Sequence, residues 1–320
     1  MHWLSMEISA LVMNDKYYNM TYVYLLVLLS ALISRLVFIL YSPAGGGDWI
    51  IYSTVAENIL SGCGVSLSTP NSGDCVPHFG GNQGPGYPVF ISLSWLVGGH
   101  ENIYVRLFQL SFYIIILLYL VRAIKIYTSS PKVALWIGIV LALSPLGIAW
   151  PRYLQTETLA LAGTLWVFSE LLLSLHQSKI RTIPIVVALV FTTFIRLDAV
   201  LLIAPIVTTL FIIYKPSDFF KKGLLMAMIF SLPWGMWLVR NYAVGMDNIL
   251  PSQMALPQNA KAPDGYLKWC KTWTTLEYQR PGSQWPITRF AYNNISIDRG
   301  VYTTKGEKIK VEKLIKDLKK

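Results

Sequence analysis

The chain has 320 residues, of which 54% are hydrophobic and only 14% are charged. A soluble domain carries about 25% charged residues, so this composition excludes an ordinary soluble protein and indicates a polytopic membrane protein. The formal net charge is +10. The basic residues lie between apolar segments, as the positive-inside bias and contact with anionic lipid would produce, so we expect no nucleic-acid partner.

Apolar stretches long enough to cross a bilayer, which takes about 20 residues, recur along the chain up to residue 240. They lie at 21–41, 103–124, 133–150, 159–175 and 223–239, and the stretch at 183–214 is long enough for two spans with a turn at 196–198. A main chain in lipid must satisfy its own polar groups, so the spans are helices. We therefore expect an all-α bundle of about seven transmembrane helices in 1–240 and an extracytoplasmic segment at 241–320.

The basic residues predict the orientation of this bundle. They gather in three connections between spans, which contain Arg122, Lys125 and Lys132; Lys179 and Arg181; and Lys215, Lys221 and Lys222. The positive-inside rule puts these connections in the cytoplasm. The first loop at 42–102, the turns near 151–157 and 196–198, and everything after residue 240 then lie on the outer face. We expect a multi-pass protein of a bacterial inner membrane.

A glycine run at 45–47 leads into Asp48 directly after the first span. Apolar residues recur at helical spacing over 49–60, which predicts a short helix on the membrane surface. Asp48 would be its N-cap, a contribution of roughly 1 kcal/mol. Glycines at this point also let a ligand approach the main chain closely. Asp48 is therefore a candidate catalytic carboxylate as well as a candidate cap.

The first outer loop contains a second short apolar run at 89–97, opened by the Gly-Pro-Gly-Tyr-Pro segment at 84–88. The run is too short to cross a bilayer, so we expect an interfacial or re-entrant helix. Cys63 and Cys75 flank a polar stretch of the same loop. They would form a disulfide worth about 3 kcal/mol or stay two free thiols, and the sequence favours neither.

Five ionisable residues fall at predicted helix ends on the outer face: Arg152, Glu157, Arg196, Asp198 and Arg240. Each has a structural explanation, since Arg152 could pair with Glu157, Arg196 could pair with Asp198, and Arg240 could reach the membrane interface. A bundle that only needs to fold has little reason to gather three arginines at one face. Because a guanidinium binds phosphate in bidentate fashion, the set suggests a site for a phosphate head group.

The ordered motifs resemble the GT-C membrane glycosyltransferases, specifically the protein O-mannosyltransferase/aminoarabinose transferase-like group (glycosyltransferase family 39-like). The matching pieces cover roughly residues 21–245 and comprise Gly47-Asp48 with Tyr52, Ala56 and Gly62; Pro85-Gly86-Tyr87-Pro88; Ser144-Pro145; Arg152 with Thr156-Glu157; Arg196; and Pro233-Trp234 with Arg240-Asn241-Tyr242.

The resemblance implies a GT-C-like bundle in which Asp48 is the catalytic base and Glu157 supports it. It also implies that the arginines, Arg152, Arg196 and Arg240, bind the lipid phosphate, with Tyr52 and Tyr87 as further substrate-binding residues. The chain departs from the family in two ways. Asp48 is followed by Trp49, where some members have an Asp-Glu pair, and related enzymes continue with more spans and a soluble domain. The chain is then either a short variant or a piece of a longer protein.

By this resemblance the protein is an inverting glycosyltransferase. It would move a sugar from a polyprenyl-phosphate donor to a hydroxyl acceptor on a protein, a lipid or a glycan. We expect no required cofactor, and a divalent metal stays possible. The alternatives are a transporter or flippase of lipids or sugar-lipids, and a non-catalytic lipid-binding subunit. Transporters tend to carry ionisable residues near the midplane, often in paired repeats, whereas here the charges gather at the outer boundary, which favours the enzyme.

Overall fold

The computed structural model describes residues 19–41, 48–67, 75, 77 and 84–245, all of which belong to one compact unit. These residues form helices and turns, together with an isolated β-bridge between Ser66 and Pro77. The predicted all-α fold is therefore confirmed for the described part of the chain. The glycine run at 45–47 and residues 246–320, which make up most of the predicted extracytoplasmic segment, lie outside it.

Among the described helices, four are long and apolar enough to cross a membrane: α2 (Met20–Tyr41), α5 (Asn102–Thr128), α8 (Glu157–Gln177) and α11 (Pro216–Ala243). The shorter segments are α6 (Pro131–Ala142), α7 (Pro145–Ala149), η2 (Trp150–Arg152), α9 (Thr182–Ile195), η3 (Leu197–Leu202) and α10 (Ile203–Ile213). The helices α6, α9 and α10 have 12, 14 and 11 residues, fewer than the roughly 20 that a crossing takes. A helical membrane protein is thus confirmed, but seven crossings are not.

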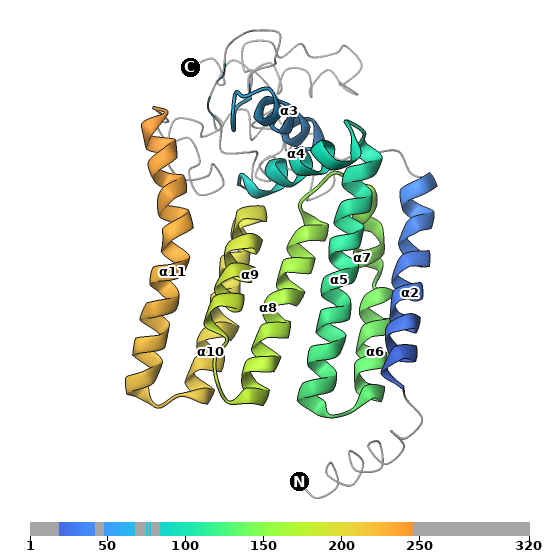
Figure 1. The fold of residues 1–320 in the computed structure, drawn as a ribbon, viewed down its shortest axis with the longest axis vertical. Helices are drawn as coiled ribbons and strands as arrows, with labels where there is room; N and C mark the ends of the chain where they lie inside the picture. Colours follow the sequence, from blue (N-terminus) through green and yellow to red (C-terminus); the bar gives the residue numbers. More distant parts are fainter. Residues whose placement is uncertain (1–18, 42–47, 68–74, 76, 78–83, 246–320) are drawn as a thin grey trace, which may run out of the picture. The chain divides into compact units, whose positions relative to one another are not determined.

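The long and short helices of the bundle lie side by side, with α2 at one edge and α11 at the other (Figure 1). The connections α5–α6, α8–α9 and α10–α11 share one end of the bundle (Figure 1), so the three basic connections do lie together. Two further helices, α3 (Trp49–Leu60) and α4 (Gly86–Gly98), lie across the opposite end. Which end faces the cytoplasm stays a prediction.

The stretch at 133–150, which the sequence predicts as one span, is broken between α6 and α7. Pro145 has no N–H, so it cannot bond to the carbonyl of Leu141. Arg35 of α2, which is fully buried, supplies a donor at this break: its Nη1 lies 2.6 Å from the carbonyl oxygen of Ala142. The hydroxyl of Tyr113 donates to the carbonyl of Leu141 at 3.1 Å. The carbonyl groups of Leu141 and Ala142 at the break therefore accept hydrogen bonds from side chains inside the bundle.

The helices α8 and α9 pack closely because α8 has a glycine at the contact. A Cβ atom added at Gly163 would lie 3.0 Å from the Cβ of Thr192 on α9, closer than such atoms normally approach. Thr192 is buried and its hydroxyl donates to the carbonyl of Ala188 at 2.6 Å, so a Cβ atom at position 163 would displace a packed, hydrogen-bonded side chain. The short distance between the two helices therefore depends on glycine, which has no side chain, at position 163.

We expect Gly163→Ala to lower the midpoint of thermal unfolding, because overpacking a tight contact costs about 1–3 kcal/mol. Gly223→Ala on α11 is the matched control, since a Cβ there meets no atom within 4 Å. Alanine is the better helix former by roughly 0.5–1 kcal/mol, so the control keeps or raises the midpoint. Both midpoints are measured in lipid nanodiscs. An equal shift of the unfolding midpoint in the two variants would contradict the close α8–α9 contact.

Candidate functional site

An apolar cluster holds α3 and α4 on the end of the bundle. Its buried members are Tyr52, Ala56, Tyr87, Ile91, Trp95, Val105, Leu154, Leu159 and Ile195. Leu159 belongs to the first turn of α8 and Ile195 is the last residue of α9. Packing of apolar side chains at these positions therefore brings the start of α3 to the start of α8 and to the end of α9.

A small polar cavity of about 30 Å³ lies where these three elements meet. Its lining residues are Asp48, Tyr52, Gln155, Thr156, Glu157 and Arg196. Four of them, Asp48, Tyr52, Glu157 and Arg196, are site residues that the sequence predicts. The volume suits about one water molecule, so a sugar or phosphate would have to enter from the adjoining groove or widen the cavity.

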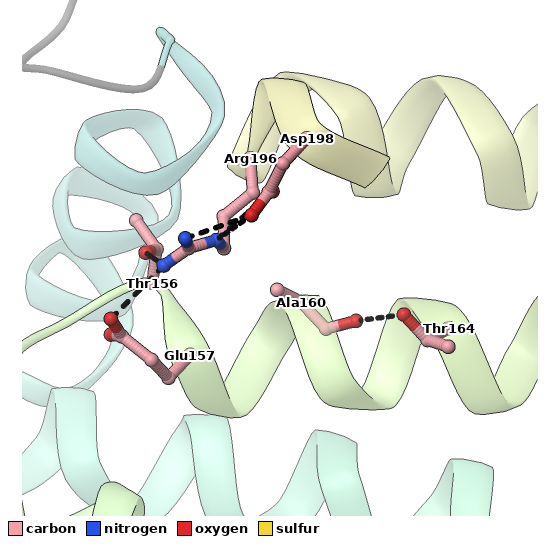
Figure 2. Close-up of polar contacts among 6 residues, drawn as sticks. All are labelled: Thr156, Glu157, Ala160, Thr164, Arg196 and Asp198. Carbon is pink, nitrogen blue, oxygen red and sulfur yellow. Dashed lines mark hydrogen bonds and ion pairs between the residues drawn. The ribbon is translucent and has the colours of Figure 1, made fainter. Parts of the chain in front are cut away.

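Arg196 lies between two carboxylates (Figure 2). Its Nη1 donates to Oε1 of Glu157 at 3.0 Å and to Oγ1 of Thr156 at 3.3 Å. Its Nε and Nη2 donate to the carboxylate of Asp198 at 3.1 and 2.9 Å. The Arg196–Asp198 pair that the sequence suggests is present, and Glu157 extends it across to α8. Of the described residues that line the cavity and the groove, three are carboxylates and one is a guanidinium.

The possible pair between Arg152 and Glu157 is not formed, because Glu157 pairs with Arg196 instead. The guanidinium of Arg152 lies over the ring of Tyr153, 4.3 Å from its centroid, and donates to the Tyr153 hydroxyl. Arg152 is not among the described residues that line the cavity or the groove. Local stacking on the neighbouring ring keeps this arginine out of the site.

Asp48 occupies the N-cap position of α3, and its main-chain carbonyl accepts from the amides of Ile51 and Tyr52 at 3.1 and 3.2 Å. Its carboxylate makes no capping hydrogen bond, so the expected side-chain cap is wrong. The side chain lines the cavity instead. The carboxylate is thus available to a ligand, with the start of the helix fixing where it lies.

The two predicted tyrosines differ in their access to the cavity. Tyr52 lines it, and burial, followed by the negative charges of Asp48 and Glu157, raises its pKa well above the usual range. Its hydroxyl therefore stays neutral and able to donate. Tyr87 is fully buried against Tyr52, with ring centroids 5.1 Å apart, and is not among the described residues that line the cavity. Its burial gives Tyr87 a place in the core behind the cavity.

Arg240, at the end of α11, binds the loop after α3. Its Nη2 donates to the carbonyl of Val65 at 2.7 Å, and its guanidinium lies 5.0 Å from the ring centroid of Trp237. It is not among the described residues that line the cavity or the groove. Cys63 and Cys75 form a disulfide in the same loop, which decides the alternative that the sequence leaves open. Arg240 thus secures a cross-linked loop.

An apolar groove of about 540 Å³ opens beside the cavity, between α8 and the η3–α10 segment. Glu157, Arg196 and Asp198 form its polar part. The rest is lined mainly by apolar side chains: Trp150, Ala160, Leu161, Thr164, Phe168, Ala199, Leu201, Leu202 and Pro205. Along α8 the lining runs from Glu157 to Phe168, which at 1.5 Å per residue is about 16 Å. The groove has the dimensions of a site for an amphiphile.

Sequence reasoning does not identify Gln155 or Trp150 as site residues. Trp150 is the first residue of η2 and Gln155 lies between η2 and α8; their only sequence signal is that Trp150 precedes the predicted turn at 151–157 and Gln155 belongs to it. The described residues contain no group of three His, Cys, Asp or Glu side chains placed to hold a metal ion. Asp48 and Glu157 are the carboxylates in the cavity wall to which a cation would bind.

We expect Arg196→Gln to lower the thermal midpoint, because it leaves the partly buried Glu157 without its cation, a loss of about 1–3 kcal/mol for a charged hydrogen bond. Asp198→Asn has a smaller effect, since the Asp198 side chain is 58% exposed and a solvated pair contributes little. Lys221→Gln, an exposed cation at the other end of the bundle, is the control. Equal midpoints for Arg196→Gln and Lys221→Gln would contradict a structural role for the ion pair.

Comparison of the chain with protein-family models, with curated proteins and with solved structures found no match. The resemblance to the GT-C glycosyltransferases therefore rests on the motif residues, and membership of that family stays a prediction. The geometry of Asp48, Tyr52, Glu157 and Arg196 is independent of it. Any functional assignment has to follow from this geometry and from the charge and shape of the groove.

Proposed function

We propose that this protein is a membrane glycosyltransferase that moves a sugar, with inversion, from a polyprenyl-phosphate donor to a hydroxyl acceptor. One observation carries the proposal: two carboxylates from different elements, Asp48 and Glu157, line a small polar cavity with Arg196, and Glu157 and Arg196 also line the polar part of the adjoining apolar groove. The protein, lipid or glycan that presents the hydroxyl group is not specified by this geometry.

The groove favours a lipid-linked donor over a soluble one. Along α8 its apolar part runs from Ala160 to Phe168, about 12 Å at 1.5 Å per residue, which suits a hydrocarbon chain, and Arg196 belongs to the polar part of the same lining. A polyprenyl phosphate has a matching arrangement, with an anionic head group at one end of a long apolar tail. A donor bound in this way would have its tail between α8 and α10 and its sugar near the cavity that contains Asp48.

In the proposed reaction the acceptor hydroxyl attacks the anomeric carbon from the face opposite the phosphate. The carboxylate of Asp48 takes the hydroxyl proton, a new C–O bond forms, and the bond from the anomeric carbon to the phosphate oxygen breaks. The lipid phosphate leaves with the bonding electrons, and its growing charge is stabilised by Arg196. The proposal assigns no cofactor to this step.

The charges around Arg196 set a condition on donor binding. Glu157 and Asp198 both accept from this guanidinium, which leaves it little free positive charge. Asp198 is the more exposed of the two, so we propose that it turns into solvent as the donor phosphate takes its place. Glu157 stays paired and holds the guanidinium over the groove.

The disulfide supports an outer-face location for this reaction. Disulfides persist in oxidising compartments, and Cys63 and Cys75 belong to the same end of the protein as α3. The three basic connections lie at the opposite end of the bundle (Figure 1), in keeping with the positive-inside rule. Both features favour a site on the extracytoplasmic face, such as the periplasmic face of a bacterial inner membrane.

A lipid transporter or flippase is the second candidate, because an apolar groove with a polar end would also suit a lipid in transit. Asp48 makes no ion pair within the described part of the chain, which favours the enzyme, since a flippase site has no need of a proton acceptor beside the head group. Transport assays in vesicles separate the two, because a flippase moves lipid between leaflets without breaking a glycosidic bond.

We expect Asp48→Asn to slow sugar transfer by about 10²–10⁴-fold, since the amide cannot accept the proton. The assay uses the full chain in nanodiscs with a panel of radiolabelled polyprenyl-phosphate sugars. Asp218→Asn, an exposed aspartate at the start of α11, is the matched control and keeps the wild-type rate. Transfer by Asp48→Asn at the wild-type rate would remove Asp48 as the base.

We expect Ala160→Phe to fill the groove and reduce the polyprenyl phosphate that co-purifies with the protein, as measured by mass spectrometry. Ala160 lines the groove on α8, where a phenyl ring would occupy the space of the tail. Thr208→Phe on the exposed face of α10 adds the same ring outside the groove and keeps the lipid. Equal amounts of lipid in both variants would contradict the groove as the tail site.

A further inference from the structure

Gln109 lies near the start of α5, and its side-chain amide is fully buried. Its Nε2 donates to the carbonyls of Pro151 and Tyr153 at 2.7 and 2.9 Å. Its Oε1 accepts from the hydroxyl of Tyr87 at 3.2 Å. Both N–H groups of the amide are therefore used, and all three bonds go to elements other than α5.

The two carbonyls belong to the short η2 helix and to the residue that follows it, where α-helical hydrogen bonding is interrupted before α8. Buried carbonyls without a partner are costly, so this stretch needs donors from elsewhere. Gln109 supplies them at Pro151 and Tyr153. The next residues along the chain, Gln155, Thr156 and Glu157, line the cavity. The position of the Glu157 carboxylate thus follows from a turn that Gln109 holds.

The third bond links the same amide to the other wall of the cavity. Tyr87 of α4 donates to Gln109 and packs edge-on against Tyr52 of α3. Tyr52 lines the cavity together with Asp48, one turn before it in α3. One amide therefore connects the segment that leads to Glu157 with α3, the helix that follows Asp48.

A second side chain of α5 acts in the same way one turn earlier. Arg106 is buried, and its Nη1 donates to the carbonyl of Ile39 at 2.9 Å, near the end of α2. Asp48 follows Ile39 by nine residues. The same face of α5 thus binds the main chain ahead of both carboxylates.

We propose that Gln109 is a positioning residue that sets the distance between the Asp48 and Glu157 carboxylates. Its effect on catalysis rests on the proposed function, whereas its effect on the turn does not. An amide that only satisfied buried carbonyls would change stability throughout the bundle. A positioning residue loosens the turn at 151–156 and leaves the rest of the bundle intact.

The first test is hydrogen–deuterium exchange on the full chain in nanodiscs. Gln109→Glu keeps the size and the acceptor but loses both donors, and it places a carboxylate against two carbonyls. Exchange in the peptide 150–157 rises about tenfold or more, as expected for loss of hydrogen bonds that hold a buried turn, while exchange in 162–174 of α8 stays unchanged. Ser111→Ala, exposed on the same helix, is the control and changes neither peptide.

If Gln109→Glu does not fold, Gln109→Met gives the same measurement without a buried charge. Unchanged exchange at 150–157, or an equal rise across the bundle, overturns the proposal. The transfer assay then separates an effect on carboxylate position from an effect on donor binding. We expect the kcat of the folded variant to fall about tenfold or more, because small displacements of reacting groups are costly. The KM for the donor changes little. Wild-type kcat in a variant with a loosened turn also overturns the proposal.

A failure of the proposed function looks different. The wild-type chain then transfers no sugar from any polyprenyl-phosphate donor, and only the kinetic readout is lost. The exchange measurement still decides whether Gln109 holds the turn, because it reads the main chain directly.

Discussion

Main-chain carbonyls at interrupted helix ends are the constraint on which this structure depends. Within a bilayer such groups have no water to bond with, so each break in a helix needs a donor from another element. The buried side chains of Arg35, Arg106 and Gln109 meet this need at Ala142, Ile39, and Pro151 with Tyr153. The fold can therefore interrupt its helices, and the cavity lies next to one of these interruptions, between η2 and α8.

This constraint also explains how the arginines divide. Arg35, Arg106 and Arg240 bind main-chain carbonyls, and Arg152 stacks on Tyr153. Arg196 is the arginine that the groove lining contains, and it binds carboxylates. A guanidinium that holds a helix end is structural whatever ligand binds, whereas one that is paired with an exposed carboxylate can exchange partners. The candidate for ligand binding thus differs from these four arginines in the kind of partner that it has.

Local features of the structure could be predicted from the sequence, and distant partners could not. The helix at 49–60 follows from apolar spacing, and the turn at 196–198 from two charges between apolar runs. The break at Pro145 is missed because apolar residues continue on both sides of it. The partner of Arg240 is a carbonyl 175 residues away, and no local pattern encodes such a contact. Convergence of Asp48 and Glu157 follows from the resemblance, but the burial of Tyr87 follows only from packing.

The disulfide between Cys63 and Cys75 has a consequence for the order in which the protein is assembled. The two cysteines are 12 residues apart, so their loop can be closed as soon as this stretch has been translated and has reached an oxidising compartment. Arg240, which binds Val65 inside that loop, is synthesised much later. With the proposed outer-face location, the loop can therefore be closed before α11 is made, so that the last described helix docks on a segment whose freedom the disulfide has already reduced.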